Sequence, residues 1–269
     1  MSFFQILVIS MFVCSMQTNT SLKASSIEHS PAGSTTRVRA SIESLDLEEI
    51  LKHTRNLDAQ SPVDEASKNL RSKWLAAGYF NIYILAKHSD EISSDLAIKK
   101  DEFYQKVLDH SHRSIDSDPN DSNAHAMLTV IYGLKISENP LSAIKNGRKL
   151  LNHRNSALQK IDSNPRVSLL EAISQIHRSN THEKQTEALE LLLKSEQLFD
   201  QELKKKASSD DSVFSWGYTM NQIFLAETYE KIGNNLLALK YFNKSKEPSP
   251  NLIRAIDGVD RCKAKLIRR

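Results

Sequence analysis

Histidines are the residues of this chain whose type most readily supports chemistry, because imidazole binds metal ions and transfers protons near neutral pH. The sequence holds nine of them, and His110 and His112 form the closest pair. Residues two apart on an α-helix point about 200° apart, so these two rings would not share one metal ion. His177 and His182 flank a predicted turn beside Glu183. A zinc site takes three or four protein ligands, and the sequence shows no such set. We therefore predict no metal site, and we interpret the histidines as solvated residues at helix ends.

Other residue patterns that carry catalysis are also missing from the sequence. It has no Gly-rich phosphate loop, no G-x-S-x-G and no H-E-x-x-H. Its two cysteines, Cys14 and Cys262, are too far apart in sequence for a C-x-x-C redox pair. Acidic pairs at 48–49 and 210–211 lie in charge-mixed segments, where helix capping and solubility explain them. We therefore predict a binding protein that is not an enzyme and has no cofactor.

Composition favours an all-α protein. The chain has 269 residues, of which 39% are hydrophobic and 26% charged, and this suits one or two globular domains. Only 7 Gly and 7 Pro occur, which argues against a loop-rich β fold. A net charge of +3 is too small for a general nucleic-acid interface. Residues 250–269 hold six basic and two acidic side chains. We interpret them as the solvated face of a terminal helix, although a basic helix could also contact phosphate or anionic lipid.

An apolar run over residues 3–14 marks the N-terminus, and polar residues follow at 17–20. The run is shorter than the ~20 residues that a membrane-spanning helix needs. It matches the apolar region of a secretory signal, although no Lys or Arg precedes it. We predict a signal peptide over residues 1–24, followed by export. The alternatives are a membrane anchor through residues 3–14, a misassigned start codon, or lipidation of Cys14.

Removal of residues 1–24 would leave Cys262 as the only cysteine, which is compatible with a bacterial periplasm. Residues 25–40 contain Ser, Thr, Pro and Gly and are predicted to form a disordered linker. The segment 41–269 is then the folded, helical part of the chain.

Apolar residues recur at helical spacing along most of this helical part. Short turns separate the segments, which predicts that they pack as helix pairs. The predicted helices span 41–57, 64–88, 96–115, 122–134, 140–158, 165–176 and 187–195, with two more inside 222–250 and a last one over 251–267.

The pair inside 222–250 has the clearest pattern. Small residues at Ala226, Ala238 and Ser245 lie on the facing stripes of its two helices, where they let the helix axes approach closely. Tyr229 and Phe242 are expected to fill the volume between the axes. A Gly after the first helix and prolines after the second are expected to end the two helices, since Gly suits a C-cap and Pro cannot continue a helix. These residues are Gly233, Pro248 and Pro250.

Features of this pair recur earlier in the chain. The segment 114–119, Ser-Ile-Asp-Ser-Asp-Pro, recurs 46 residues later as Lys-Ile-Asp-Ser-Asn-Pro at 160–165. Ala188, Leu192 and Ser195 have the same spacing as the stripe of the last pair. The chain therefore reads as an array of related helix pairs.

These residues resemble the tetratricopeptide repeat (TPR), whose pattern W-x2-L-G-x2-Y…A-x3-F…P covers about 34 residues. Gln222 stands where Trp is expected, and Ala226 stands where Gly is usual. The stretch 114–250 is similar to small exported TPR proteins of Gram-negative envelopes. It is more loosely similar to the periplasmic TPR subunits of TRAP-type transporters. Within 222–250, the residues that occupy positions of the TPR pattern are Leu225, Ala226, Tyr229, Ala238, Phe242 and Pro250.

The resemblance implies an α-α superhelix, a right-handed solenoid whose stacked helix pairs form a concave groove. It implies a scaffold or adaptor that binds a protein or peptide partner, with no nucleic acid and no membrane span in the mature chain. One alternative is an accessory subunit of a solute transporter that binds a small ligand or a solute-binding protein. Another is a cytosolic TPR protein with a false signal, and the oligomeric state stays open. First-helix side chains are expected to line the groove, namely Asn123, Ala126, Val130, Met220, Ile223, Glu227 and Glu230.

Overall fold

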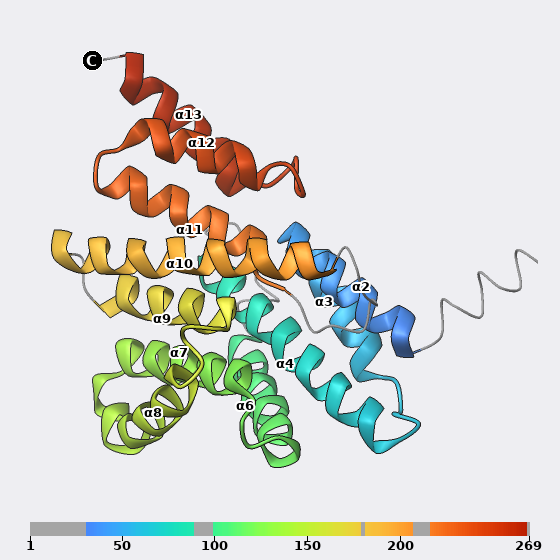
Figure 1. Ribbon diagram of the computed structural model, residues 1–269. Coiled ribbons are helices and arrows are strands. Elements are labelled where there is room, and N and C mark those ends of the chain that lie inside the picture. The colour runs from blue at the N-terminus through green and yellow to red at the C-terminus, as the bar shows by residue number, and fades with distance from the viewer. Residues whose placement is uncertain (1–30, 89–98, 179–180, 207–215, 268–269) are drawn as a thin grey trace, which may run out of the picture.

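The computed structural model describes residues 31–88, 99–178, 181–206 and 216–267, and every regular element in these ranges is helical (Figure 1). The predicted all-α class is confirmed. The helices are α2 (Pro31–Ser44), α3 (Leu47–Asp58), α4 (Glu65–His88), α6 (Lys100–Ser117), α7 (Ser122–Glu138), the short 3-10 helix η1 (Pro140–Ser142), α8 (Ala143–Leu158), α9 (Pro165–Arg178), α10 (His182–Lys206), α11 (Tyr218–Lys231), α12 (Asn235–Ser245) and α13 (Ile253–Ile267).

The helices pack neighbour to neighbour along the chain. The pairs α4–α6, α7–α8, α9–α10 and α11–α12 each pack closely, and α13 covers α12. Contacts of α6 with α7, α7 with α9, and α10 with α11 join one pair to the next. Figure 1 shows this succession from α4 through α10 to α13, with α2 and α3 beside α4.

The last pair is built as its residue spacing predicts. Ala226, Ala238 and Ser245 have no exposed surface, and Phe242 is equally buried between the helices. Close approach continues into α13, where a Cβ on Gly258 would lie 2.4 Å from ring atoms of Phe242. A larger residue at 258 would therefore force α12 and α13 apart.

The turn between α11 and α12 also follows the prediction. Gly233 directly follows the C-cap residue of α11, Ile232, and has a φ of 84°, a left-handed conformation that glycine adopts without strain. Asn234 then caps α12, because its side-chain oxygen accepts a hydrogen bond from the backbone N–H of Leu237 at 3.1 Å.

The predicted disordered linker over residues 25–40 is wrong for residues 31–40, which belong to α2. Val38 and Ile42, one helical turn apart, are 0% and 1% exposed, so this helix packs into the core despite its many polar residues. Glu43 also joins α2 to the far end of the chain. Its carboxylate accepts hydrogen bonds from the backbone N–H groups of Gly217 at 2.7 Å and Thr219 at 3.2 Å. The predicted signal peptide at 1–24, and residues 25–30, lie outside the described residues.

Two other expectations need correction. The helix predicted over 187–195 runs from His182 to Lys206, so it extends beyond the predicted bounds at both ends. Phe199 lies in this extension and is 2% exposed, so burial of its ring supports a longer helix. The two copies of the internal echo are not equivalent either. Residues 114–117 form the last turn of α6, whereas the matching residues 160–163 follow the end of α8. Pro165 is the first residue of α9, whereas the matching Pro119 lies before the start of α7.

Candidate binding site

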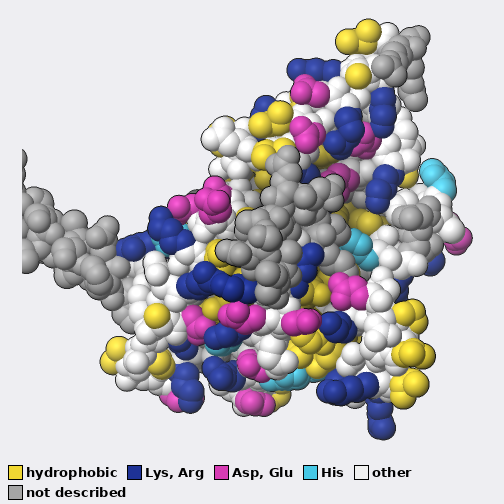
Figure 2. Space-filling view, turned by 180° about the vertical axis from the view of Figure 1, so that it is seen from behind, with side chains coloured by type: hydrophobic (Ala, Val, Ile, Leu, Met, Phe, Trp, Pro, Cys, Tyr) yellow, Lys and Arg dark blue, Asp and Glu magenta, His cyan; other side chains and the backbone are white. Residues whose placement is uncertain are grey.

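Helix α8 buries little of itself. Only Asn146 and Ala157 of its 16 residues are buried, and neither is a large apolar side chain. Leu141 of η1 is 79% exposed, and Ile144 and Leu151 of α8 are 90% and 56% exposed. These are three of the eight exposed large hydrophobic side chains among the described residues. Figure 2 shows hydrophobic side chains at the outer edge of the molecule where α8 lies.

The space beside α8 is open because α8 packs on α7 but makes little contact with α9. At the neighbouring junctions, α6 packs on α7 and α10 packs on α11. The gap between α8 and α9 forms a cavity of about 320 Å³, which we call the α8–α9 cleft. Its walls are Val130, Gly133, Leu134, Ile136 and Ser137 from α7, Leu150 from α8, and Ser174, His177 and Arg178 from α9.

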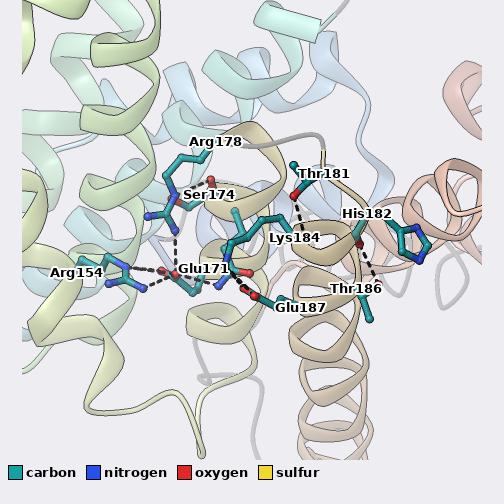
Figure 3. Close-up of polar contacts among 10 residues, drawn as sticks. Arg154, Glu171, Ser174, Arg178, Thr181, His182, Lys184, Thr186 and Glu187 are labelled. Atoms are coloured by element: carbon teal, nitrogen blue, oxygen red, sulfur yellow. Dashed lines mark hydrogen bonds and ion pairs between the residues drawn. The ribbon is translucent and has the colours of Figure 1, made fainter.

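A buried ion pair closes one end of the cleft. The Glu171 side chain is 5% exposed, and Arg154 of α8 donates three hydrogen bonds to it, of 3.3, 3.0 and 2.7 Å. Arg178 approaches the same carboxylate at 3.2 Å (Figure 3). Hydrogen bonding to Glu171 raises the pKa of Arg154 above its ordinary value. On the far side of this pair, α8 and α9 leave a void of only about 10 Å³. The cleft therefore lies on one side of this ion pair, beside the C-terminal ends of α7 and α9.

Arg178 is the charged residue at the open rim of the cleft. Its side chain is 53% exposed. Its Nε donates to the Ser174 carbonyl at 3.2 Å, and its Nη2 donates to Glu171. Its Nη1 makes no hydrogen bond to any described residue, and its side chain lines the cleft.

Three histidines meet where α6, α7 and α8 join. The Nδ1 atoms of His125 and His153 lie 2.9 Å apart, and Nε2 of His125 lies 3.1 Å from the carbonyl oxygen of Pro119. A carbonyl only accepts, so Nε2–H of neutral His125 donates to it. The Nδ1 of His125 then accepts a hydrogen bond from the Nδ1–H of His153. The His112 ring lies 5.7 Å from the His153 ring. Burial lowers the pKa of His153 to about 4.

The interpretation of the histidines as solvated is wrong for His125, which is 8% exposed, and for His110. His110 is 2% exposed and stacks on Tyr79 at 5.8 Å. Burial lowers its pKa to about 4. His112 points to the His125–His153 pair instead, so the two closest histidines in sequence do separate. Within the described ranges, no group of three or more His, Cys, Asp or Glu residues is arranged to hold a metal ion.

The seven predicted groove residues do not form one surface. Ala126, Val130, Met220 and Ile223 are at most 3% exposed, because α7 and α11 are buried on nearly every side. These four side chains have almost no surface to offer a partner, although Val130 contributes to the inner wall of the cleft.

The three polar residues of the predicted groove have partners inside the chain. Asn123 accepts a hydrogen bond from the Asn164 side chain at 2.9 Å. Glu227 pairs with Arg254, and Glu230 pairs with Arg261 and Lys265, so both glutamates tie α11 to α13. Of the α7 set, only Val130 thus lines the cleft, whereas the two glutamates of the α11 set pair with the last helix.

The outer side of α8 was not among the predicted binding residues. A signal was present there, because Ile144 and Leu151 lie seven residues apart, and residues 143–158 contain basic side chains and no acidic one. Seven residues make two helical turns, so both side chains lie on one stripe. An apolar stripe in an otherwise basic helix is a signal for an interface that can be read without a structure.

A second hollow lies between α4 and α6. Its volume is about 620 Å³, and polar and charged side chains of both signs line it, among them Glu65, Lys68, Arg113 and Asp116. Ala66 is the one apolar residue among those that line it, so the α8–α9 cleft is the better candidate.

Comparison with protein-family models, with curated proteins and with solved structures finds no match to this chain. Among the described helices, none combines the length and the apolar character that crossing a membrane requires.

Proposed function

We propose that this chain is a non-enzymatic scaffold that binds a protein or peptide partner through the α8–α9 cleft and the exposed side of α8. The proposal rests on one observation. Three large apolar side chains, Leu141, Ile144 and Leu151, are exposed on η1 and α8 beside a cavity of about 320 Å³. Contiguous apolar surface on a folded protein marks an interaction site, because leaving it in water costs free energy that a partner recovers.

The proposed architecture is a TPR-like α-α superhelix. Neighbour-to-neighbour packing and the small buried residues Ala226, Ala238 and Ser245 support this assignment. The proposed setting is the bacterial periplasm, after removal of a signal peptide at 1–24. The apolar run at 3–14 supports export.

A second candidate function is that of a transporter accessory subunit that holds a small ligand. The cavity volume favours it, since about 320 Å³ lies at the lower end of the range of about 300–1,000 Å³ for ligand pockets. A ligand co-purifying with the chain and contacting Leu150 and Arg178 would favour this function over the scaffold.

Crosslinking mass spectrometry in the native cell tests the scaffold. Lys145 and Lys149 of α8 are exposed and carry reactive amines. We expect crosslinks from them to one defined protein. The paired substitutions Ile144→Ser and Leu151→Ser should remove these crosslinks, whereas Leu236→Ser should not. Leu236 is a matched control, because it is 68% exposed on α12.

The absence of any protein crosslinked to the wild-type chain would overturn the scaffold function. Crosslinks that persist unchanged in the double variant would place the interface elsewhere and overturn the assignment to α8.

A further inference from the structure

We infer that the segment bound at the α8–α9 cleft is an acidic amphipathic helix. This inference rests on the proposed function and adds the chemistry of the partner. The apolar side of such a helix would cover the stripe on α8 and insert side chains into the cleft. Its carboxylates would meet the basic residues of α8 and Arg178.

The positive charge of α8 indicates that the partner is acidic. Residues 143–158 contain Lys145, Arg148, Lys149 and Arg154 and no acidic residue. Arg154 is neutralised by Glu171, but the other three are exposed and form no ion pair with any described residue. The whole chain is nearly balanced, with 36 basic and 33 acidic residues. The unpaired positive charge on α8 is therefore a local feature that favours an acidic partner.

The spacing of the exposed apolar side chains fits a helical partner. Leu141, Ile144 and Leu151 follow one another by three and seven residues, so they extend along one side of η1 and α8. At about 1.5 Å per residue, Ile144 and Leu151 lie about 10 Å apart along the helix axis. A partner helix with apolar residues at i, i+3 or i+4 and i+7 matches this separation, and this is the usual spacing of helix-in-groove recognition.

The shape of the site favours a partner helix over a membrane surface. A basic, apolar helix can also lie on anionic lipid, but a lipid surface would leave the cavity behind α8 unfilled. Gly133 leaves space at the inner wall of the cleft because it has no side chain. A Cβ added there would meet only Leu150, at 3.6 Å. Side chains from a partner helix can enter this space, and carboxylates on that helix can reach Nη1 of Arg178 at the rim.

Fluorescence anisotropy with the full chain tests the inference. The probe is a fluorescein-labelled synthetic helix with Leu at i, i+3, i+4 and i+7 and Glu at the flanking positions. One control peptide carries Lys in place of Glu, and another has the same composition in scrambled order. We expect the acidic helix to bind at least about tenfold more tightly than either control, because charge and spacing both contribute.

Variants locate the binding. Ile144→Ser with Leu151→Ser, and separately Arg148→Glu with Lys149→Glu, should each weaken binding of the acidic helix by about tenfold or more. The matched controls Leu236→Ser and Lys263→Glu should leave it unchanged, since both residues are exposed away from α8. Circular dichroism of each variant confirms that it is folded. Gly133→Leu is a variant that fills the cleft without touching the surface, and it should also weaken binding.

Equal affinity for the acidic and basic helices, or acidic-helix binding that the α8 variants do not change, would overturn the inference. So would binding to anionic phospholipid vesicles without binding to the peptide. If crosslinks in the native cell map to α8 while the acidic helix fails to bind, the scaffold function stands and only the partner chemistry is wrong.

Discussion

The α11–α12–α13 end of the molecule and the α7–α8–α9 region use the same plan of packed helices with opposite results. In both, the first helix is buried on nearly every side. The second helices differ. Helix α12 buries Ala238, Phe242 and Ser245 completely, whereas α8 buries only Asn146 and Ala157.

The difference shows that the position of the large apolar residues on the second helix determines how closely this helix packs against the helix that follows it. Helix α12 carries an aromatic ring that fills the space between its neighbours, and Gly258 lets α13 come close to that ring. Helix α8 instead carries Ile144 and Leu151 on its outer side, and the Arg154–Glu171 ion pair ties it to α9. The same plan thus produces a closely packed end and an open cleft.

Loss of Phe242 should have the largest effect on stability. Phe242→Ala removes a fully buried ring, which we expect to lower the free energy of unfolding by about 3–5 kcal/mol. Leu150→Ala, in a half-buried residue of α8, should cost about 1 kcal/mol. Chemical denaturation measures both. Equal losses at the two sites would remove the contrast between the two regions.

Removal of Arg154 should have the next largest effect. Arg154→Ala leaves the buried Glu171 carboxylate with Arg178 and a 3.4 Å hydrogen bond from the Gln175 amide. We expect a loss of about 2 kcal/mol, less than for a fully buried pair because Arg154 is 29% exposed. Arg154→Lys should fall between the wild type and the alanine variant, since lysine cannot make two parallel hydrogen bonds. A loss below about 0.5 kcal/mol would show that the pair does not hold α8 against α9.

Glu43 provides a test at the junction of α2 and α11. Glu43→Ala removes the acceptor for the backbone N–H groups of Gly217 and Thr219, and we expect a loss of about 1–2 kcal/mol, as for a helix cap. Glu43→Gln, which keeps one acceptor oxygen, should lose less. No change in the alanine variant would mean that α2 does not stabilise the C-terminal pair.

Acid should weaken the α7–α8 junction more than the C-terminal end. Burial and the nearby His125, His112 and Lys149 lower the pKa of His153 to about 4. The unfolded chain, with a pKa of about 6.5, therefore binds more protons, and stability is full above about pH 6.5 and is lost as pH falls toward 4. We expect about 1 kcal/mol from this residue after allowance for solvent screening. Denaturation at several pH values should show a shallower loss in His153→Gln, and an unchanged slope would contradict the assignment.

Surface apolar residues should have the smallest effect on stability. Ile144→Ser and Leu236→Ser should each change the free energy of unfolding by less than about 0.5 kcal/mol, because both side chains are already exposed. If Ile144→Ser destabilises the chain by much more, the stripe on α8 packs inside the protein and is not an interface.

Local patterns predicted much of the fold. The spacing of Ala226, Ala238 and Ser245 and the turn at Gly233 were readable because neighbouring residues determine them. Helix α2 was missed, since its polar composition hides Val38 and Ile42, and since Glu43 meets Gly217, 174 residues away in sequence.

The site was harder to predict than the fold. The expected groove relied on first-helix positions, but the first helices α7 and α11 are covered on nearly every side. The cleft exists because α8 fails to pack on α9, and no local pattern encodes a missing contact between two helices. Only the exposed stripe at Ile144 and Leu151 left a trace in the sequence.

Hydrogen exchange of the full chain, with and without the acidic amphipathic helix, tests the open cleft as a binding site most directly. Few buried apolar contacts predict that α8 amides exchange faster than α12 amides in the free protein. Addition of the helix should slow exchange in α8 and in the facing end of α9 and leave α12 and α13 unchanged. Equal protection of α8 and α12 before addition, or slowing confined to α12 and α13, would contradict the account.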